Sequence, residues 1–250
     1  MTQADPQRLP PAYRFIASWL KPLLWALTKR EWHGVENLPK DGGFVACPNH
    51  LSYYDPFAIA LFLYANGRPP FFLGKEEVFR IPLLGRLIRA ADQVPVFRGT
   101  EQAADAYRAA LAGVDAGKCV VMFPEGTLTR DPGLWPMRPK TGAARLALTT
   151  RCPVVPIALW GPQDVLGTYE KRLHLLPRKT IRVSAGPPVD LSDLYDRTAE
   201  STALREAADR IVAAITAQLE TLRGETAPPQ RLDSRTLGLP EVGNFKRGRR

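Results

Sequence analysis

The residues best suited to chemistry are a histidine and an aspartate five positions apart, His50 and Asp55. A histidine with a near-neutral pKa can act as a general base toward an alcohol. A carboxylate on its second ring nitrogen fixes the tautomer and stabilises the imidazolium. The intervening turn can bring Asp55 back to His50. A structural histidine followed by an N-capping aspartate has the same spacing, so the pair alone leaves both interpretations open.

Other charged and small residues follow later apolar runs. Glu125, Gly126 and Thr127 come directly after one such run and indicate a tight polar turn that carries a carboxylate. Lys75 and Arg98 each follow another run, and arginine can bind phosphate in a bidentate manner. Each feature by itself also fits an ordinary turn or a solvated charge. Together, at the strand ends where α/β sheets place their sites, they indicate a site for a phosphorylated or anionic substrate.

Strands alternate with helices along most of the chain, which predicts an α/β sheet covered by helices. The 250 residues and 45% hydrophobic content fit one sizeable core. We expect helices over residues 56–64, 83–89, 101–116, 143–148 and 199–223. We expect strands over residues 42–47, 71–73, 94–97, 120–123 and 154–160, and an edge-like strand over 181–183.

An apolar stripe at helical spacing covers residues 15–27, with Arg14 before it and Lys29 and Arg30 after it. Its length of about 13 residues falls short of the roughly 20 that cross a bilayer. Tryptophans within and beside the stripe favour a membrane interface. The stripe therefore fits a helix packed on the protein's own core or a helix lying in the plane of a membrane.

The formal charge of +9 and the pI near 9.7 indicate an acidic partner: nucleic acid, anionic lipid or a phosphorylated substrate. The basic residues are scattered without a recognised nucleic-acid-binding motif, which argues against nucleic acid. The 3 cysteines lie beside or within apolar runs, which predicts buried thiols in a reducing compartment. Cys47 stands close enough to His50 for a Cys–His nucleophile to be an alternative.

Four blocks in a fixed order resemble the 1-acylglycerol-3-phosphate acyltransferase (PlsC-like) family of glycerolipid acyltransferases. The first has the His-x4-Asp spacing, the second is an apolar run ending in arginine, the third reads Phe-Pro-Glu-Gly-Thr-Leu-Thr, and the fourth is an apolar Val-Pro run. They lie at residues 49–56, 94–98, 123–129 and 153–158. With shorter likenesses at 73–77 and 140–142, the resemblance covers about residues 35–190.

The resemblance implies a single-domain glycerol-3-phosphate acyltransferase-like fold. This fold has a mostly parallel or mixed central sheet with helices on both faces, here preceded by an N-terminal amphipathic helix. It also implies a role for each matching residue. His50 would be the general base and Asp55 its partner. The acceptor site would contain Arg98 as the phosphate ligand, Lys75 as a second cationic contact, and Glu125, Gly126 and Thr127. This sequence has Leu128 where the family usually has arginine, and Arg130 lies two residues later.

The resemblance further implies transfer of a fatty acyl group to the sn-2 hydroxyl of 1-acylglycerol 3-phosphate, which makes phosphatidic acid in phospholipid biosynthesis. The donor would be acyl-CoA or acyl carrier protein, with no metal or other cofactor. Expected partners are lysophosphatidic acid or a related membrane lipid, the donor and an anionic membrane surface, with no nucleic acid. Two alternatives remain: acylation of glycerol 3-phosphate or another lipid, and a non-catalytic lipid-binding module.

These inferences give an expected domain organisation. A membrane-interface helix would occupy residues 1–34, the acyltransferase domain 35–223, and a disordered basic tail 224–250. The protein is expected at the cytoplasmic face of the membrane, as a peripheral or monotopic protein.

Overall fold

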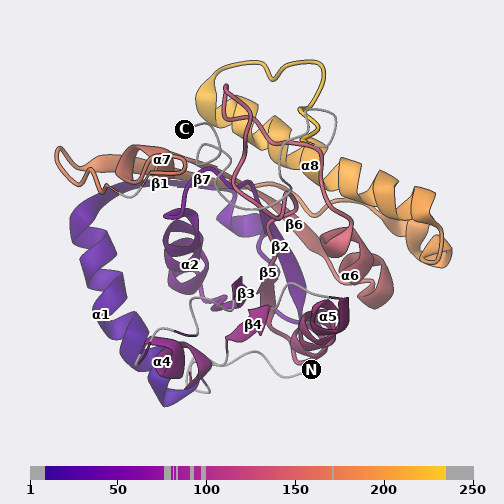
Figure 1. Cartoon of the computed structure of the whole chain (residues 1–250), viewed down its shortest axis with the longest axis horizontal. Coiled ribbons are helices and arrows are strands. Elements are labelled where there is room, and N and C mark those ends of the chain that lie inside the picture. The colour runs from indigo at the N-terminus through magenta and orange to yellow at the C-terminus, as the bar shows by residue number, and fades with distance from the viewer. Residues whose placement is uncertain are drawn as a thin grey trace.

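The computed structural model describes residues 9–75, 80, 82, 84–90, 93–96, 100–170 and 172–234. Its centre is a 7-stranded sheet in the order β1-β7-β6-β2-β5-β3-β4 (Figure 1). Only the β6–β7 pair among the described strands is antiparallel. The strands are β1 (Thr28–His33), β2 (Phe44–Pro48), β3 (Pro70–Lys75), β4 (Val94–Val96), β5 (Cys119–Val121), β6 (Val154–Trp160) and β7 (Lys179–Ala185).

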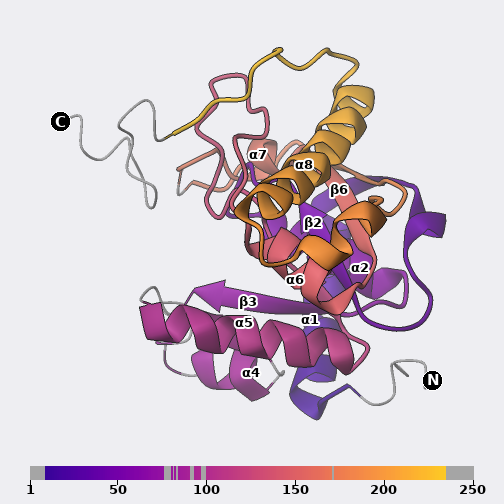
Figure 2. The same cartoon turned by 90° about the vertical axis from the view of Figure 1, so that its right-hand side faces the viewer.

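Helices cover both faces of this sheet, as expected from the sequence (Figures 1 and 2). The α-helices are α1 (Pro11–Leu27), α2 (Asp55–Ala65), α4 (Leu84–Ala90), α5 (Thr100–Asp115), α6 (Gly142–Thr150), α7 (Pro162–Val165) and α8 (Ser201–Arg223). Two short 3-10 helices are η2 (Val35–Asn37) and η3 (Ser192–Arg197). In the part of the chain that is described, no helix combines the length and apolar character needed to span a membrane.

The apolar core has two main clusters, one on each face of the sheet. Successive residues of a strand point to opposite faces, so Phe44 and Ala46 join one cluster while Val45 and Cys47 join the other. The first cluster includes side chains from α1, α2 and α7, and the second includes side chains from α5, α6 and α8. Burial on both faces explains why the central strands are continuous apolar runs with no alternation.

The strand β1 was not anticipated from the sequence, because Thr28–His33 reads Thr-Lys-Arg-Glu-Trp-His and lacks an apolar run. It pairs in parallel with β7, which therefore lies between β1 and β6. The expectation of an edge strand over 181–183 is wrong for this reason. The sheet also begins at Thr28, so the boundary expected at residue 34 falls after its first strand.

The described part of the C-terminal tail packs against the domain. The Arg138 N–H donates to the Leu232 carbonyl over 3.0 Å, and the Arg138 guanidinium pairs with Asp233 at 2.6 Å. The Ala227 N–H donates to Glu220 at 2.8 Å. Disorder was expected from residue 224 because this stretch is polar and proline-bearing, but these contacts hold 225–233 in place. Residues 235–250 lie outside the described residues.

Arg223 joins this C-terminal region to the loop that follows β5. Its guanidinium carbon lies 3.9 Å from the ring centroid of Trp135 and 4.3 Å from that of Trp160. It also donates to the Gly133 carbonyl over 2.8 Å. One side chain thus fastens the end of α8 to the loop and to the end of β6.

We expect Arg223→Ala to lower the free energy of unfolding by about 1–3 kcal/mol, because two cation–π contacts and a hydrogen bond are lost. Arg205→Ala, an exposed position on the same helix, is the matched control and should change stability by less than about 0.5 kcal/mol. Urea denaturation measures both. Equal effects of the two substitutions would contradict this role for Arg223.

Candidate active site

The turn between β2 and α2 closes around the carboxylate of Asp55. Oδ2 of Asp55 accepts hydrogen bonds from the Leu51 N–H over 2.6 Å and the Ser52 N–H over 2.8 Å. The same oxygen lies 2.8 Å from Nδ1 of His50. Asp55 is the first residue of α2, where the helix dipole favours a negative charge. The same oxygen of Asp55 therefore holds the backbone of the turn and contacts the His50 ring.

His50 is held with one ring nitrogen engaged and the other directed away from Asp55. Because Nδ1–H donates to the carboxylate, Nε2 is the nitrogen left to accept a proton. The imidazole stacks on Phe123, with ring centroids 4.1 Å apart and planes inclined by 25°. The His50 side chain is 16% exposed, whereas that of Asp55 is fully buried. This is the geometry of an oriented general base that a substrate can reach.

Burial raises the pKa of Asp55 above its usual value, although its hydrogen bonds to His50 and to two backbone N–H groups act in the opposite direction. These donors stabilise the ionised carboxylate within the buried turn. An ionised Asp55 would stabilise the imidazolium that forms when His50 takes up a proton.

Asn49 fastens the residue before His50 to the neighbouring strand β6. Its Oδ1 accepts from the Leu159 N–H over 2.7 Å, and its Nδ2 donates to the Leu159 carbonyl over 3.1 Å. The side chain is almost fully buried. The sequence interpretation gave Asn49 no role, although a buried amide directly after an apolar strand is a signal that it bonds to backbone.

Glu125 lies in the loop after β5, where its buried side chain bonds to the turn that carries His50. Its Oε1 accepts from the His50 N–H over 3.1 Å, and its Oε2 accepts from the Met137 N–H over 3.0 Å. The residue is only 3% exposed, and burial raises its pKa from the usual 4.5 to about 8, with the two N–H donors acting in the opposite direction. With both oxygens engaged by backbone, Glu125 is suited to positioning His50 more than to contacting a substrate.

Gly126 stands where the chain turns sharply after Glu125. Its φ of +68° lies in the left-handed region that favours glycine. A Cβ at this position would come within 3.1 Å of Cδ of Lys140, which passes over the turn. The backbone N–H of Lys140 also donates to the Pro124 carbonyl over 2.9 Å. Lys140 is thus a cation beside the turn that carries Glu125.

Leu128 and Arg130 are both buried. The Leu128 carbonyl accepts from the Tyr169 hydroxyl over 2.9 Å, and this phenol lies close to Arg130 and Thr127. The next residue, Thr129, donates its N–H to the His50 carbonyl over 2.7 Å. The loop after β5 is therefore bonded to the dyad turn on one side and to Tyr169 on the other.

Two residues singled out from the sequence are only partly placed. Lys75 ends β3, which pairs with β5, so its backbone lies three residues beyond the Phe72–Val121 pair on the carboxyl side of the sheet. Nothing further is described of its side chain. Arg98 lies outside the described residues. The structure thus brings together His50, Asp55, Glu125, Gly126 and Thr127, while the roles expected for Lys75 and Arg98 stay predictions.

We expect the stability of the protein to fall as the pH rises from about 4.5 to about 8, relative to the Glu125→Gln variant. The unfolded chain loses the Glu125 proton near 4.5, whereas the folded protein retains it to about 8, so the folded state binds more protons between these values. The difference should be on the order of 1–4 kcal/mol across this range. Urea denaturation of both proteins at several pH values measures it, and parallel pH dependences would contradict it.

Comparisons with known proteins identify the family of this chain. The family model described as Acyltransferase matches residues 29–160. A chloroplastic 1-acyl-sn-glycerol-3-phosphate acyltransferase from Brassica napus is 33% identical over 180 residues, which make up 71% of this chain and 50% of the relative. One from Bacillus subtilis is 26% identical over 162 residues, covering 64% of this chain and 76% of the relative. This chain therefore spans about half the length of the plant relative.

A solved structure shows the same architecture. The crystal structure of PlsC, the 1-acyl-sn-glycerophosphate acyltransferase of Thermotoga maritima, aligns with a TM-score of 0.62 and 25% identity. The alignment covers 86% of this chain and 81% of the other. It confirms the expected fold, and the sequence matches confirm the resemblance drawn from the four blocks. Since the family model covers more than half of the 250 residues, the chain belongs to the Acyltransferase family.

Proposed function

We propose that this protein transfers a fatty acyl group from an acyl thioester to the free sn-2 hydroxyl of 1-acylglycerol 3-phosphate, which yields phosphatidic acid for phospholipid biosynthesis. The observation that carries the proposal is the 2.8 Å contact between His50 Nδ1 and Asp55 Oδ2, with the His50 ring partly accessible. The names of the relatives from Brassica napus, Bacillus subtilis and Thermotoga maritima support this acceptor.

The proposed reaction needs no covalent enzyme intermediate. Nε2 of His50 removes the proton of the acceptor hydroxyl as its oxygen attacks the thioester carbonyl carbon. Asp55 stabilises the resulting imidazolium, and backbone N–H groups of the loop after β5 stabilise the tetrahedral oxyanion. The intermediate then collapses with cleavage of the carbon–sulfur bond, and His50 returns the proton to the departing thiolate. Acyl-CoA or acyl carrier protein would serve as the donor, and no metal takes part in the proposed steps.

We assign the acceptor phosphate to cations around this turn. Lys140 passes over Gly126 and is exposed, which supports it as a phosphate contact. Arg130 is buried beside Tyr169 and supports the loop from within. Lys75 and Arg98 remain proposed ligands by family resemblance. Leu128 is buried and apolar and cannot bind phosphate through its side chain. Lys140 would therefore supply the positive charge that an arginine at this position usually supplies in the family.

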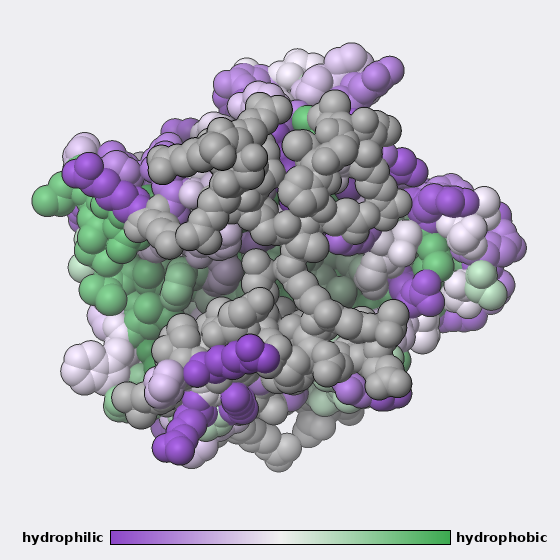
Figure 3. Space-filling view, viewed as in Figure 1, coloured by the Kyte–Doolittle hydropathy of each residue, from purple (hydrophilic) through white to green (hydrophobic). Residues whose placement is uncertain are grey.

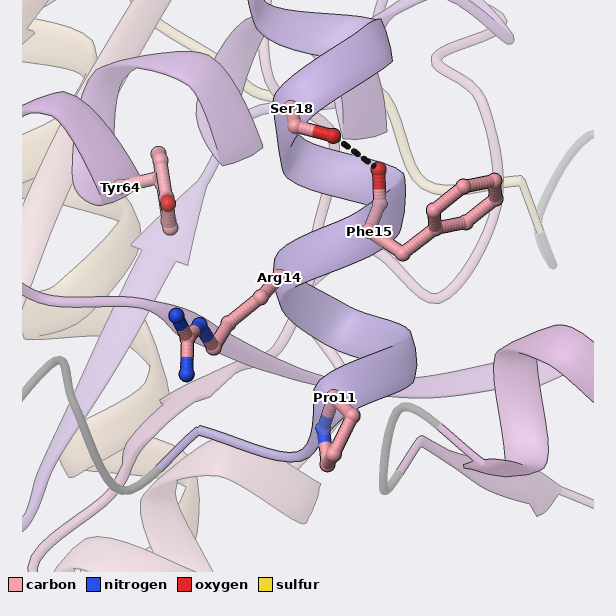
Figure 4. A pocket seen from close by; sticks show the side chains of 5 residues that line it. All are labelled: Pro11, Arg14, Phe15, Ser18 and Tyr64. Atoms are coloured by element: carbon pink, nitrogen blue, oxygen red, sulfur yellow. Dashed lines mark hydrogen bonds between the residues drawn. The ribbon is translucent and has the colours of Figure 1, made fainter.

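The proposed membrane contact is the exposed side of α1. Its exposed large apolar residues are Phe15, Trp19, Leu23 and Trp25. Figure 3 shows hydrophobic residues gathered along the side of the molecule where α1 lies. Around the first turns of α1 is a pocket lined in part by Arg14 and Tyr64; Arg14 extends toward the side of Tyr64, whereas Phe15 points the other way (Figure 4).

This division of α1 supports a helix lying in the plane of an anionic membrane, with one side on the domain and one in the lipid interface. Within the proposed organisation, α1 is the membrane-interface segment and the sheet from Thr28 through α8 forms the transferase domain. Because the proposed donor is a cytoplasmic thioester, we place the protein at the cytoplasmic face as a peripheral or monotopic protein.

We expect His50→Ala to reduce acyl transfer by at least about 1,000-fold, since the general base is lost. Asp55→Asn should also reduce it strongly, because the amide no longer stabilises the imidazolium. Cys47→Ser is the control for a Cys–His nucleophile: Cys47 is buried, which raises the pKa of its thiol, and the variant should keep most of the activity. A lipid-product assay with purified protein measures all three. Equal activity of His50→Ala and the wild type would contradict the role of His50 as the general base, and absence of transfer by the wild type would favour a non-catalytic lipid-binding module.

We expect Lys140→Ala to raise KM for 1-acylglycerol 3-phosphate by roughly 10-fold, about 1.4 kcal/mol, because a phosphate contact is removed. KM for an uncharged monoacylglycerol should change little. Lys118→Ala is the matched control, since Lys118 precedes β5 at the opposite edge of the sheet and packs over Phe71. An equal rise in KM for both acceptors would contradict a phosphate-specific role. Glycerol 3-phosphate assayed alongside them tests the alternative acceptor.

A further inference from the structure

The large hydrophobic residues that are exposed in the described part of the chain fall in three segments only. Four belong to α1, two lie in or just after the turn that carries His50, and two lie in the loop between α7 and β7. The last pair is Leu173, 54% exposed, and Leu176, 84% exposed. Single exposed apolar side chains are common on protein surfaces, whereas a group of large ones marks a contact surface.

The loop from residue 166 to residue 178, here called the α7–β7 loop, lies beside the C-terminal end of α1 (Figure 1). The Arg178 guanidinium donates to the carbonyls of Trp25 and Thr28, both over 2.9 Å. The strand pairing begins at the same point, with Thr28 opposite Lys179. The exposed leucines of the loop therefore extend the apolar side of α1, and Figure 3 shows hydrophobic residues at both places.

The same loop is bonded to the catalytic turn. The Ser52 hydroxyl donates to the Leu166 carbonyl over 2.5 Å, and the Thr168 hydroxyl donates to the Leu51 carbonyl over 2.7 Å. Farther along, a β-bridge between Leu166 and Leu173 folds the loop back on itself. Leu173 is thus paired with Leu166, and Leu166 is hydrogen-bonded to Ser52 in the turn that carries His50.

The charges around the exposed leucines fit an anionic surface. Residues 171–182 contain five basic residues and no acidic residue: Lys171, Arg172, Arg178, Lys179 and Arg182. The stretch 6–30, which includes α1, likewise contains no aspartate or glutamate. Among these cations Arg182 pairs with Glu31 at 2.7 Å, and no acidic residue stands within the stretch itself. Apolar side chains within such a basic stretch match a bilayer with anionic headgroups, where acyl chains accept the leucines and headgroups accept the cations.

We propose that the α7–β7 loop is a second membrane-contact element, which inserts Leu173 and Leu176 into an anionic bilayer surface next to α1. Through its bonds to Leu51 and Ser52, the loop holds the His50 turn at the lipid interface. The acceptor hydroxyl then reaches Nε2 of His50 while the acyl chain stays in the bilayer. This last step rests on the proposed acyltransferase function, whereas the membrane contact does not.

The test compares the full-length wild type with Leu173→Asp/Leu176→Asp. Ala104→Asp/Ala217→Asp adds the same charge at exposed positions on α5 and α8 and is the matched control. Vesicles of phosphatidylcholine with about 30% phosphatidylglycerol are sedimented with each protein. We expect the loop variant to bind at least 10-fold more weakly than the wild type and the control. The milder Leu173→Ser/Leu176→Ser variant should bind with intermediate affinity, and circular dichroism should show all four proteins folded.

Acyl transfer is then measured with the acceptor in vesicles and with the acceptor in detergent micelles. The loop variant should lose at least 10-fold in rate with vesicles and stay within about 3-fold of the wild type with micelles. Unchanged vesicle binding would overturn the proposal, as would equal losses in both assays by a folded variant. A defect seen only with acyl carrier protein as donor would instead make the loop a carrier-protein surface. Absence of transfer by the wild type would refute the proposed function and leave the sedimentation result intact.

Discussion

One carboxylate oxygen organises the candidate site. Oδ2 of Asp55 receives two backbone N–H groups and the Nδ1–H of His50, all within 2.8 Å. A fully buried carboxylate is costly unless its charge is met by donors, and here the donors are the turn that carries the base. Opening the turn would remove all three of these donors from the oxygen. The hydrogen bonds that fold the turn therefore also orient the imidazole of His50.

Around this turn, two buried polar side chains that follow strands β2 and β5 bond to backbone. Asn49 holds the chain to β6, and Glu125 holds both the His50 amide and the loop around Met137. Each of these polar side chains is buried beyond the end of an apolar strand. Its hydrogen bonds to main chain offset the free-energy cost of removing it from water. The site is therefore rigid on its protein side and open at the edge of the imidazole.

The order of the strands explains why the segments proposed to contact the membrane lie next to this site. β6 runs toward the edge that carries the dyad, and β7, antiparallel to it, begins at that edge. β1 is parallel to β7, so the end of α1, which leads directly into β1, is brought to the same edge. The Tyr54 phenol lies close to Thr28, so the end of α1 is next to the turn that carries His50. A single antiparallel pair in an otherwise parallel sheet thus places the end of α1, the start of β7 and the turn that carries His50 side by side.

The His50–Asp55 pair, the family and most of the elements were predictable from sequence, because they depend on local spacing and on apolar runs. β6 was predicted with the bounds that the structure shows, since a run buried on both faces needs no partner to be recognised. Tertiary structure alone decided the features that depend on pairing across the chain. β1 is polar and becomes a strand only because β7 pairs with it, which in turn moves β7 away from the sheet edge. Glu125 looks like a substrate ligand in the sequence, and only the approach of His50 and Met137 shows both of its oxygens engaged by backbone.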